Sequence, residues 1–423
     1  MVDAVDRKSE TGRFAMITTP ADGGVALARI LLLATMVTLL ISVTAGQVLE
    51  GASYLAFACY PELRRRLAGT LRHPVMPGFI AFATVIAIGV FYGLASWYDS
   101  MSALIGWRRL LLLPMALAVF DDAAAKRMLI TVLTVTCVIG ALVAVVVVAA
   151  GWHMLTGFGV VFGTYTTQSS VFALVIAGCV AALVRPDAFA GHRLLGDRRI
   201  LVAAIGLLAA DIVIILPGRS GYVDLIVLPV VVVSLLVPGG WRTKAMAGLG
   251  VMVCLGVLLV ASPHARNRVM QAVTDIETVD EATGGGTLRQ RIIMWRTAVH
   301  MIKDRPIFGV GTGGFLDGYR PYVPARGWQH FETGDPHNQY LKILGEQGIV
   351  GLAAFLFFIF RALTCPAATP YRQLAIAALI GWCATSLANS HFSTFVEGRL
   401  LFFWLGAMLA GAARNTERPA ASD

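Results

Sequence analysis

A tight turn at residues 216–221, Leu-Pro-Gly-Arg-Ser-Gly, places a single arginine, Arg219, between two long apolar runs. An arginine close to hydrocarbon normally needs an anionic partner. Its planar guanidinium matches the spacing of phosphate oxygens. We therefore interpret Arg219 as a phosphate-binding residue. The alternative is an interfacial arginine whose side chain extends to lipid headgroups.

A second group of arginines lies at 287–296, where the residue pattern predicts a helix. Arg289, Arg291 and Arg296 fall within eight residues, and Arg291 and Trp295 are one turn apart on the same face. The free amides of a helix start also favour anions. This segment could bind a diphosphate, and the alternative is a solvated basic face.

His337 is the candidate general base. It lies where a long polar segment turns back into an apolar run, in the sequence Asp-Pro-His-Asn-Gln-Tyr at 335–340. An ordinary histidine pKa of about 6.5 allows proton uptake at neutral pH. Asn338 and Tyr340 are polar neighbours that could support it. A purely structural histidine is the alternative.

Neither a metal site nor a phosphate loop is expected. The pairs Asp275 with Glu277 and Asp280 with Glu281 lie in a segment that we place away from the arginines, and the histidines lack the spacing of zinc ligands. The glycine-rich residues 309–314 follow no parallel strand and precede no lysine-bearing helix start, so they predict a turn. We expect no metal and no cofactor.

Membrane helices must position these residues. The chain has 423 residues, of which 57% are hydrophobic and 14% charged, and its mean hydropathy is +0.73, well above that of a soluble domain. Its apolar runs approach the roughly 20 residues that cross a bilayer as a helix. The net charge of +9 is scattered in short clusters between these runs. Membrane topology explains that pattern better than nucleic-acid binding does.

The fold predicted is an all-α polytopic membrane protein with about 12 transmembrane helices. The second and fourth spans are the weakest, because Glu50 lies in one and Arg108 and Arg109 begin the other. The expected spans are 26–46, 47–61, 76–98, 104–121, 128–150, 169–185, 199–216, 221–237, 244–262, 347–363, 373–390 and 399–414.

Lysine and arginine concentrate in alternate short connections, which predicts that these connections are cytoplasmic. The longest of the remaining, external connections should be functional, because long loops in compact proteins usually are. The expected organisation is a cytoplasmic tail at 1–25, nine spans in 26–262, a large and mostly helical external loop with the catalytic region at 263–346, three spans in 347–414 and a cytoplasmic tail at 415–423.

Three places in the chain resemble the O-antigen ligases and the related O-antigen polymerases and oligosaccharyltransferases of bacterial envelopes. Val223 stands where that family often has leucine, four residues after the arginine of the turn. The layout also agrees over about 26–414. The similar segments are His337-Asn338 with Tyr340-Leu341 and 346–351, which matches a pattern of histidine, ten residues and glycine; Arg291 with Trp295 and 304–311; and the turn at Arg219.

The resemblance implies a multi-pass glycosyltransferase of the bacterial inner membrane whose active site and large loop face the periplasm. Its donor would be O-antigen polysaccharide on undecaprenyl diphosphate, and its acceptor a sugar hydroxyl of lipid A-core, without metal or nucleotide. Membrane lipids would surround it, and no nucleic acid is expected. In an inverting displacement, His337 would take the hydroxyl proton. The diphosphate would be bound by Arg219, Arg291 and Arg289, with possible support from Asn338, Tyr340 and Trp295.

Other functions stay open. An O-antigen polymerase or a protein O-oligosaccharyltransferase of the same superfamily would share these motifs. A transporter of lipid-linked glycans belongs to a different class and should carry ionisable residues deep within several spans, together with inverted repeats. Asp211 and Asp224 are among the few acids in the expected spans.

Overall fold

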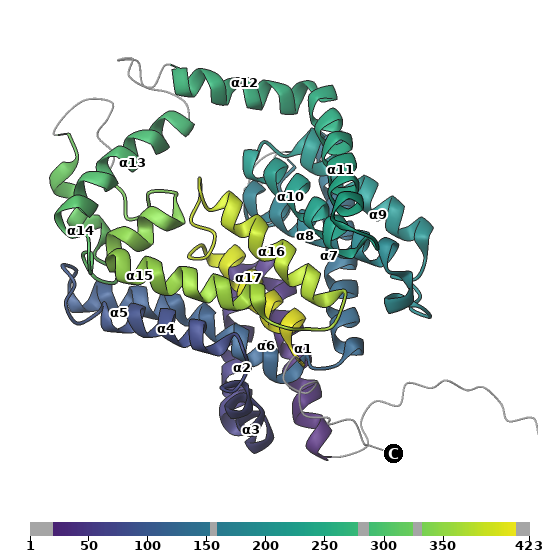
Figure 1. The fold of residues 1–423 in the computed structure, drawn as a ribbon, viewed down its shortest axis with the longest axis horizontal. Coiled ribbons are helices and arrows are strands. Elements are labelled where there is room, and N and C mark those ends of the chain that lie inside the picture. The colour runs from purple at the N-terminus through teal and green to yellow at the C-terminus, as the bar shows by residue number, and fades with distance from the viewer. Residues whose placement is uncertain (1–19, 153–158, 278–286, 325–331, 412–423) are drawn as a thin grey trace, which may run out of the picture.

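The part of the chain that the structure describes is mostly helical. A computed structural model describes residues 20–152, 159–277, 287–324 and 332–411, and these residues contain no strand. The all-α prediction is confirmed (Figure 1). The α-helices are α1 (Pro20–Ile41), α2 (Val43–Cys59), α3 (Pro61–Thr70), α4 (Met76–Ile88), α5 (Trp97–Gly106), α6 (Leu112–Val119), α7 (Ala123–Ala149), α8 (Tyr165–Val184), α9 (Arg198–Ala210), α10 (Arg219–Leu236), α11 (Trp241–Ala261), α12 (Pro263–Glu277), α13 (Thr287–Asp304), α14 (Phe315–Tyr319), α15 (Gln339–Thr364), α16 (Tyr371–Thr385) and α17 (Phe395–Leu409).

Seven helical segments of the described chain are long and apolar enough to cross a membrane. They support a multi-pass membrane protein, whereas the count of about 12 spans stays a prediction. The remaining expected spans correspond to shorter helices, among them α2, α4, α16 and α17, and to α9, which continues into the π-helical segment Asp211–Ile215. The seven segments are Gly23–Ile41, Trp97–Val119, Ala123–Ala149, Tyr165–Val184, Arg219–Leu236, Trp241–Ala261 and Gln339–Thr364.

Connections that were predicted to lie on one side of the membrane contact one another. Arg29 of α1 pairs with Asp121 at 3.2 Å, and Arg66 of α3 pairs with the same carboxylate at 3.4 Å. The Lys126 ammonium donates to the carbonyl oxygens of Met408 and Ala410 at the end of α17. These basic ends therefore share one end of the helix bundle. Which end faces the cytoplasm stays a prediction.

Glu50, which made the second expected span look weak, has a buried partner. Its Oε2 lies 3.0 Å from Nε of Arg399 on α17, and both side chains are 1% exposed. Arg108 approaches the same carboxylate at 3.6 Å, and the Tyr54 hydroxyl donates to it at 2.6 Å. A charge removed from water needs such compensation. The pair therefore joins α2 to α17 across the core.

Arg109, at the start of the fourth expected span, forms hydrogen bonds inside the helix bundle. Its guanidinium donates to the carbonyl oxygens of Ser393 and Thr394, just before α17. The Ser393 hydroxyl in turn donates to Oε1 of Gln339, the first residue of α15, at 3.0 Å. The arginine thus links the α5–α6 region to the start of α15, which follows His337.

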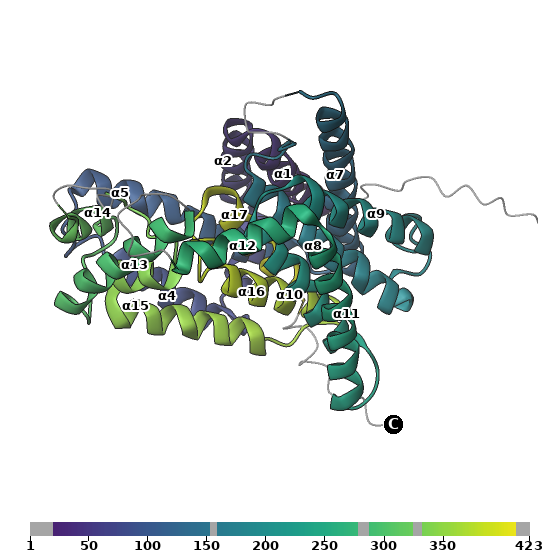
Figure 2. The ribbon, with the colours of Figure 1, turned by 90° about the horizontal axis from the view of Figure 1, so that it is seen from above.

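The segment at 263–346 is mostly helical where it is described, with α12, α13 and α14. A small separate core of Ala298, Met301, Val310, Phe315 and Tyr319 holds α13 against α14. Figure 1 shows α12 extending from the end of α11 across the top of the molecule toward α13, and Figure 2 shows the same course from above. This course returns the chain from α11 to the region of α15.

The glycine-rich residues 309–314 form turns, as predicted, and pair with α15. The amides of Val310 and Gly311 donate to the carbonyl oxygens of Gly345 and Glu346 at 2.9 and 2.7 Å. Gly311 has a φ of +84°, and a Cβ there would lie 2.1 Å from Cα of Gly93. Only glycine fits such a left-handed and crowded position. The turn therefore holds α15 from the outside.

Helix α15 starts at Gln339, eight residues before the expected start of its span at 347. Gly348 interrupts it with a φ of +63°, and a Cβ there would lie 2.2 Å from the carbonyl oxygen of Ile307. The amide of Ile349 donates to the carbonyl oxygen of Pro306 at 2.9 Å. The kink thus separates a short outer helix, which follows His337, from the long apolar part.

The buried Glu50–Arg399 pair predicts a large loss of stability when one charge is removed. Glu50→Ala should lower the free energy of unfolding by about 3–5 kcal/mol, because Arg399 loses its closest counterion in the core. Denaturant unfolding in detergent measures the loss. The control Glu62→Ala breaks a partly exposed pair with Arg66 and should cost less than about 1 kcal/mol. Equal losses in the two variants would contradict a specific role for the buried pair.

Candidate functional site

Arg219 is the first residue of α10, and α12 holds its side chain. Its Nε donates to the carbonyl oxygen of Arg268 at 3.1 Å, and its NH2 lies 3.5 Å from Oδ2 of Asp275. The side chain is 28% exposed. Arg268 itself donates to the carbonyl oxygen of Pro217 in the turn at 3.0 Å. Arg219 is therefore oriented by the protein and still reachable from solvent.

The expectation that Asp275 lies away from the arginines is wrong. Helix α12 runs back over the turn at 216–221, which brings Asp275 to Arg219. The same carboxylate oxygen accepts a hydrogen bond from the amide of Leu288, in the first turn of α13, at 3.3 Å. Asp280 and Glu281 lie outside the described residues. Asp275 thus joins the turn, α12 and α13.

Arg291 extends from α13 toward the same space. Its NH2 donates to Oδ1 of Asn389 at 3.2 Å, and the side chain is half-buried. Burial lowers the pKa of Arg291, the charge of Arg219 lowers it further, and Tyr165 and Asp335 oppose the shift. Asp275 contacts both Arg219 and the first turn of α13, so the predicted diphosphate ligands Arg219 and Arg291 lie in one region of the fold.

His337 occupies a tight turn directly before α15. Its φ of +51° lies in the left-handed region, which non-glycine residues adopt rarely and often at functional sites. Its amide donates to Oδ1 of Asp335 at 2.9 Å. From α13, the Trp295 indole donates to the carbonyl oxygen of Pro336 at 2.8 Å. Two hydrogen bonds thus hold the turn, and His337 itself is exposed.

The electrostatic surroundings of His337 favour a neutral imidazole. Partial burial of the ring lowers the pKa of His337, and the positive charges of Arg291 and Lys342 lower it further, against the opposing charge of Asp335. At neutral pH the ring is then mostly unprotonated, which is the form that accepts a proton. The charge of Arg291 therefore acts on both the predicted base and the predicted anion site.

Asp335 is ionised next to His337. Burial alone would raise the pKa of Asp335, but the charge of Lys342 and hydrogen bonds from Ser390 and the His337 amide outweigh it and hold the pKa below its ordinary value. The Ser390 hydroxyl donates to Oδ1 at 2.6 Å, and the Lys342 ammonium lies 3.8 Å from Oδ2. Asp335 thus connects the histidine turn to the segment before α17.

Asn338 and Tyr340 anchor the start of α15. Asn338 caps the helix, since its Oδ1 accepts from the amides of Tyr340 and Leu341, both at 3.0 Å. Its Nδ2 donates to the carbonyl oxygen of Leu387, and the Tyr340 hydroxyl donates to that of Cys383, both at 2.8 Å. These contacts tie α15 to the end of α16. Both residues therefore position the turn, and a direct part in chemistry stays a prediction.

Arg289 lies in the first turn of α13 and is 7% exposed. An incoming diphosphate would meet Arg219 and Arg291 first, because both are more accessible. The predicted assisting role of Arg289 stays a prediction with less structural support than that of the other two arginines.

Sequence reasoning missed Tyr165 and Asn389 as site residues. Tyr165 begins α8, is 40% exposed and packs on Gly218, where a Cβ would lie 2.8 Å from the tyrosine ring. It thus lies against the turn that carries Arg219. Both residues come from the shorter connections predicted to be external or from their borders. That shared side is the only signal that the sequence offers for them.

The acids in the expected spans are held by neighbouring side chains. Asp211 accepts from Gln168 at 3.1 Å, and Asp224 accepts from Ser170 at 2.7 Å. Both donors lie on α8, so these contacts join α8 to the π-helical segment after α9 and to α10. Among the described residues, no group of three His, Cys, Asp or Glu side chains is arranged to hold a metal ion.

Comparison with known proteins places the site within a matched region. Residues 204–356 match the family described as O-antigen ligase, and this range contains Arg219, Arg291 and His337. An uncharacterized protein of Haemophilus influenzae is 31% identical over 152 residues, which cover 34% of this chain and 37% of the relative. The aligned region thus spans less than half of either protein. Residues 204–356 of the chain are thus similar to the O-antigen ligase family.

Proposed function

We propose that this protein transfers O-antigen polysaccharide from undecaprenyl diphosphate to a sugar hydroxyl of lipid A-core, at the periplasmic face of the bacterial inner membrane. The observation that carries the proposal is a chain of contacts: Asp275 touches both Arg219 and the first turn of α13, which carries Arg291, and Trp295 of α13 holds the turn of His337. Two adjacent guanidinium groups suit a diphosphate, and a neutral histidine suits a hydroxyl proton. The match of residues 204–356 to the O-antigen ligase family supports glycosyl transfer in a membrane.

The reaction is a single displacement at the anomeric carbon of the donor. His337 takes the proton of the acceptor hydroxyl while the acceptor oxygen bonds to that carbon. The bond from the carbon to the diphosphate oxygen breaks, and its electron pair leaves with undecaprenyl diphosphate. Arg219 and Arg291 neutralise the charge that develops there, and one preorganised donor of this kind is typically worth about 3 kcal/mol. Attack from the opposite face inverts the configuration.

Without a donor, the carboxylate of Asp275 pairs with the guanidinium of Arg219. The carboxylate at 3.5 Å supplies an anion where the proposal needs a phosphate. The diphosphate therefore replaces Asp275 at Arg219, and the hydrogen bond between Asp275 and Leu288 remains to hold α12 near α13. Donor binding thus competes with an internal ion pair.

One assay separates this function from the alternatives. Purified protein receives carrier-linked glycan, lipid A-core and an acceptor protein in one reaction. Glycan on lipid A-core supports the ligase. Longer carrier-linked chains would indicate an O-antigen polymerase, and glycan on the acceptor protein would indicate a protein O-oligosaccharyltransferase. Movement of labelled lipid across liposomes without a transfer product would instead indicate a transporter.

Replacing the predicted base should slow transfer and change its pH dependence. His337→Ala should lower kcat by about 10²- to 10⁴-fold, because the hydroxyl proton loses its acceptor. In the unmodified protein, activity should fall only below pH 6.5, since the pKa of His337 is lowered and protonation removes the base. Asp335→Asn should move this acid limb to still lower pH. Rates of product formation from pH 5 to 8 test both points, and full activity of folded His337→Ala would refute the assignment.

Removing either arginine of the diphosphate site should impair transfer. Arg219→Ala and Arg291→Ala should each lower kcat by about 10²-fold or more, since a preorganised donor is lost where charge develops. Arg291→Lys should recover part of the rate, because it keeps the charge but not the planar fork. Arg296→Ala, on an exposed position of the same helix, is the matched control and should remain active. Comparable losses in Arg291→Ala and Arg296→Ala would count against a specific site.

Neutralising Asp275 should strengthen donor binding. Asp275→Asn should lower the donor KM about two- to fivefold, in line with the modest strength of a partly exposed ion pair. The amide keeps an oxygen for the hydrogen bond from Leu288, so the helix arrangement should persist. Donor titration at saturating acceptor measures KM. A higher KM would mean that Asp275 acts by orienting Arg219 and not by competing with the diphosphate.

A further inference from the structure

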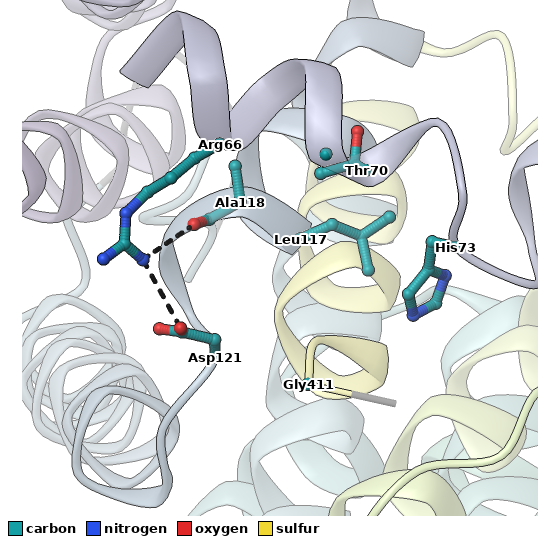
Figure 3. Close-up of a pocket in the computed structure, with 8 residues that line it drawn as sticks. Arg66, Thr70, His73, Leu117, Ala118, Asp121 and Gly411 are labelled. Carbon is teal, nitrogen blue, oxygen red and sulfur yellow. Dashed lines mark hydrogen bonds and ion pairs between the residues drawn. The ribbon is translucent and has the colours of Figure 1, made fainter. Parts of the chain in front are cut away.

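Helix α3 lies at one end of the molecule (Figure 1), and its residues line two hollows. The smaller hollow, of about 260 Å³, is lined by Arg66, Thr70, His73 and Asp121 among others (Figure 3). Its arginine is already neutralised, because Arg66 lies 2.9 Å from Glu62 and 3.4 Å from Asp121. This hollow therefore offers little net charge to an anion.

The larger hollow is an apolar groove of about 510 Å³ between α2, α3, α4 and α6. Its volume lies within the range of about 300–1,000 Å³ that is common for ligand sites. Arg64 is its one charged lining residue. The lining residues are Tyr54, Phe57, Ala58, Arg64, Leu67, Thr70, Leu71, Met76, Phe79, Ile80, Leu111, Pro114 and Met115. The groove is thus suited to a hydrocarbon chain with a charge at one end.

Arg64 is held at this groove without an acidic partner. Its NH1 donates to the carbonyl oxygen of Ala58, at the end of α2, at 2.5 Å. Both Arg64 and its neighbour Arg65 are exposed, and within the described parts of the chain neither forms an ion pair with Asp or Glu. Arg66, one residue further on, has two such partners. The positive charge beside the groove is therefore uncompensated.

We propose that this groove binds an anionic phospholipid, with an acyl chain along the apolar lining and the headgroup phosphate at Arg64. Leu67 of α3 and Leu71, the residue directly after α3, line the same groove as Arg64, so the charge and the apolar surface lie together. A basic residue at a membrane surface favours anionic lipid, and the effect corresponds to about fivefold in affinity. A zwitterionic headgroup such as phosphocholine would gain the same apolar contacts, but its own ammonium offsets the phosphate charge that Arg64 attracts. This site is separate from Arg219, Arg291 and His337.

The test compares lipids of different charge. Protein in detergent micelles is titrated with dioleoyl phosphatidylglycerol, dioleoyl phosphatidylcholine or sodium phosphate, and bound lipid is counted by native mass spectrometry while thermal unfolding is followed. Phosphatidylglycerol should bind more tightly than phosphatidylcholine, and phosphate alone should not stabilise the protein. Arg64→Gln should weaken phosphatidylglycerol binding about fivefold, and Arg64→Lys should largely retain it.

Two further variants make the result specific. Ala58→Trp projects a large ring from an exposed position into the groove and should weaken the binding of both lipids. Arg72→Gln removes an exposed arginine that does not line the groove, and it should bind as the unmodified protein does. Equal affinity for both lipids, or an equal loss in Arg72→Gln and Arg64→Gln, would overturn the proposal. Stabilisation by free phosphate alone would assign the charge to a soluble anion and would also overturn it.

Discussion

A charge that leaves water in a largely apolar protein must find a partner, because its hydration is lost and only another charge or several hydrogen bonds can replace it. This constraint organises the described structure at three depths. In the core, Glu50 and Arg399 satisfy each other and join α2 to α17. At the edge of the bundle, Arg219 has the partly exposed carboxylate of Asp275. Arg291 has the neutral amide of Asn389 and the repelling charge of Arg219. The arginine charges are therefore less completely neutralised at the candidate site than in the core.

Incomplete neutralisation leaves the arginines of the site able to bind an anion. A fully paired arginine such as Arg399 has no capacity left for a ligand, whereas Arg291 keeps charge that a diphosphate can neutralise. Burial lowers the pKa of His337, and the charge of Arg291 lowers it further, so the group that would accept a proton is kept neutral in part by a group that would bind the leaving anion. In the proposed reaction, donor binding would cancel part of that positive charge and make the histidine more basic as the acceptor arrives.

Backbone contacts around the site connect the segments that resemble the O-antigen ligase family. Residues 306–311 pair with 345–350, and glycines at 309 and 348 allow the two segments to touch. Trp295 and Asn338 then fix the turn between α13 and α15. Most of these residues touch backbone and would not touch substrate. Their contribution is the precise direction of His337, because a reacting group is effective only when its geometry is held.

Local sequence determined the helical character of the chain, the turns at 309–314 and the position of Arg219 between two apolar helices, since run length and glycine content act over a few residues. It also indicated that Arg219, Arg291 and His337 share one side, because charge alternates from loop to loop. Tertiary structure alone decided which charges meet. Glu50 and Arg399 are 349 residues apart, and Arg291 and Asn389 are 98 apart. The burial of Arg289, the return of α12 to Arg219 and the place of Tyr165 depend on how helices pack, which no local pattern encodes.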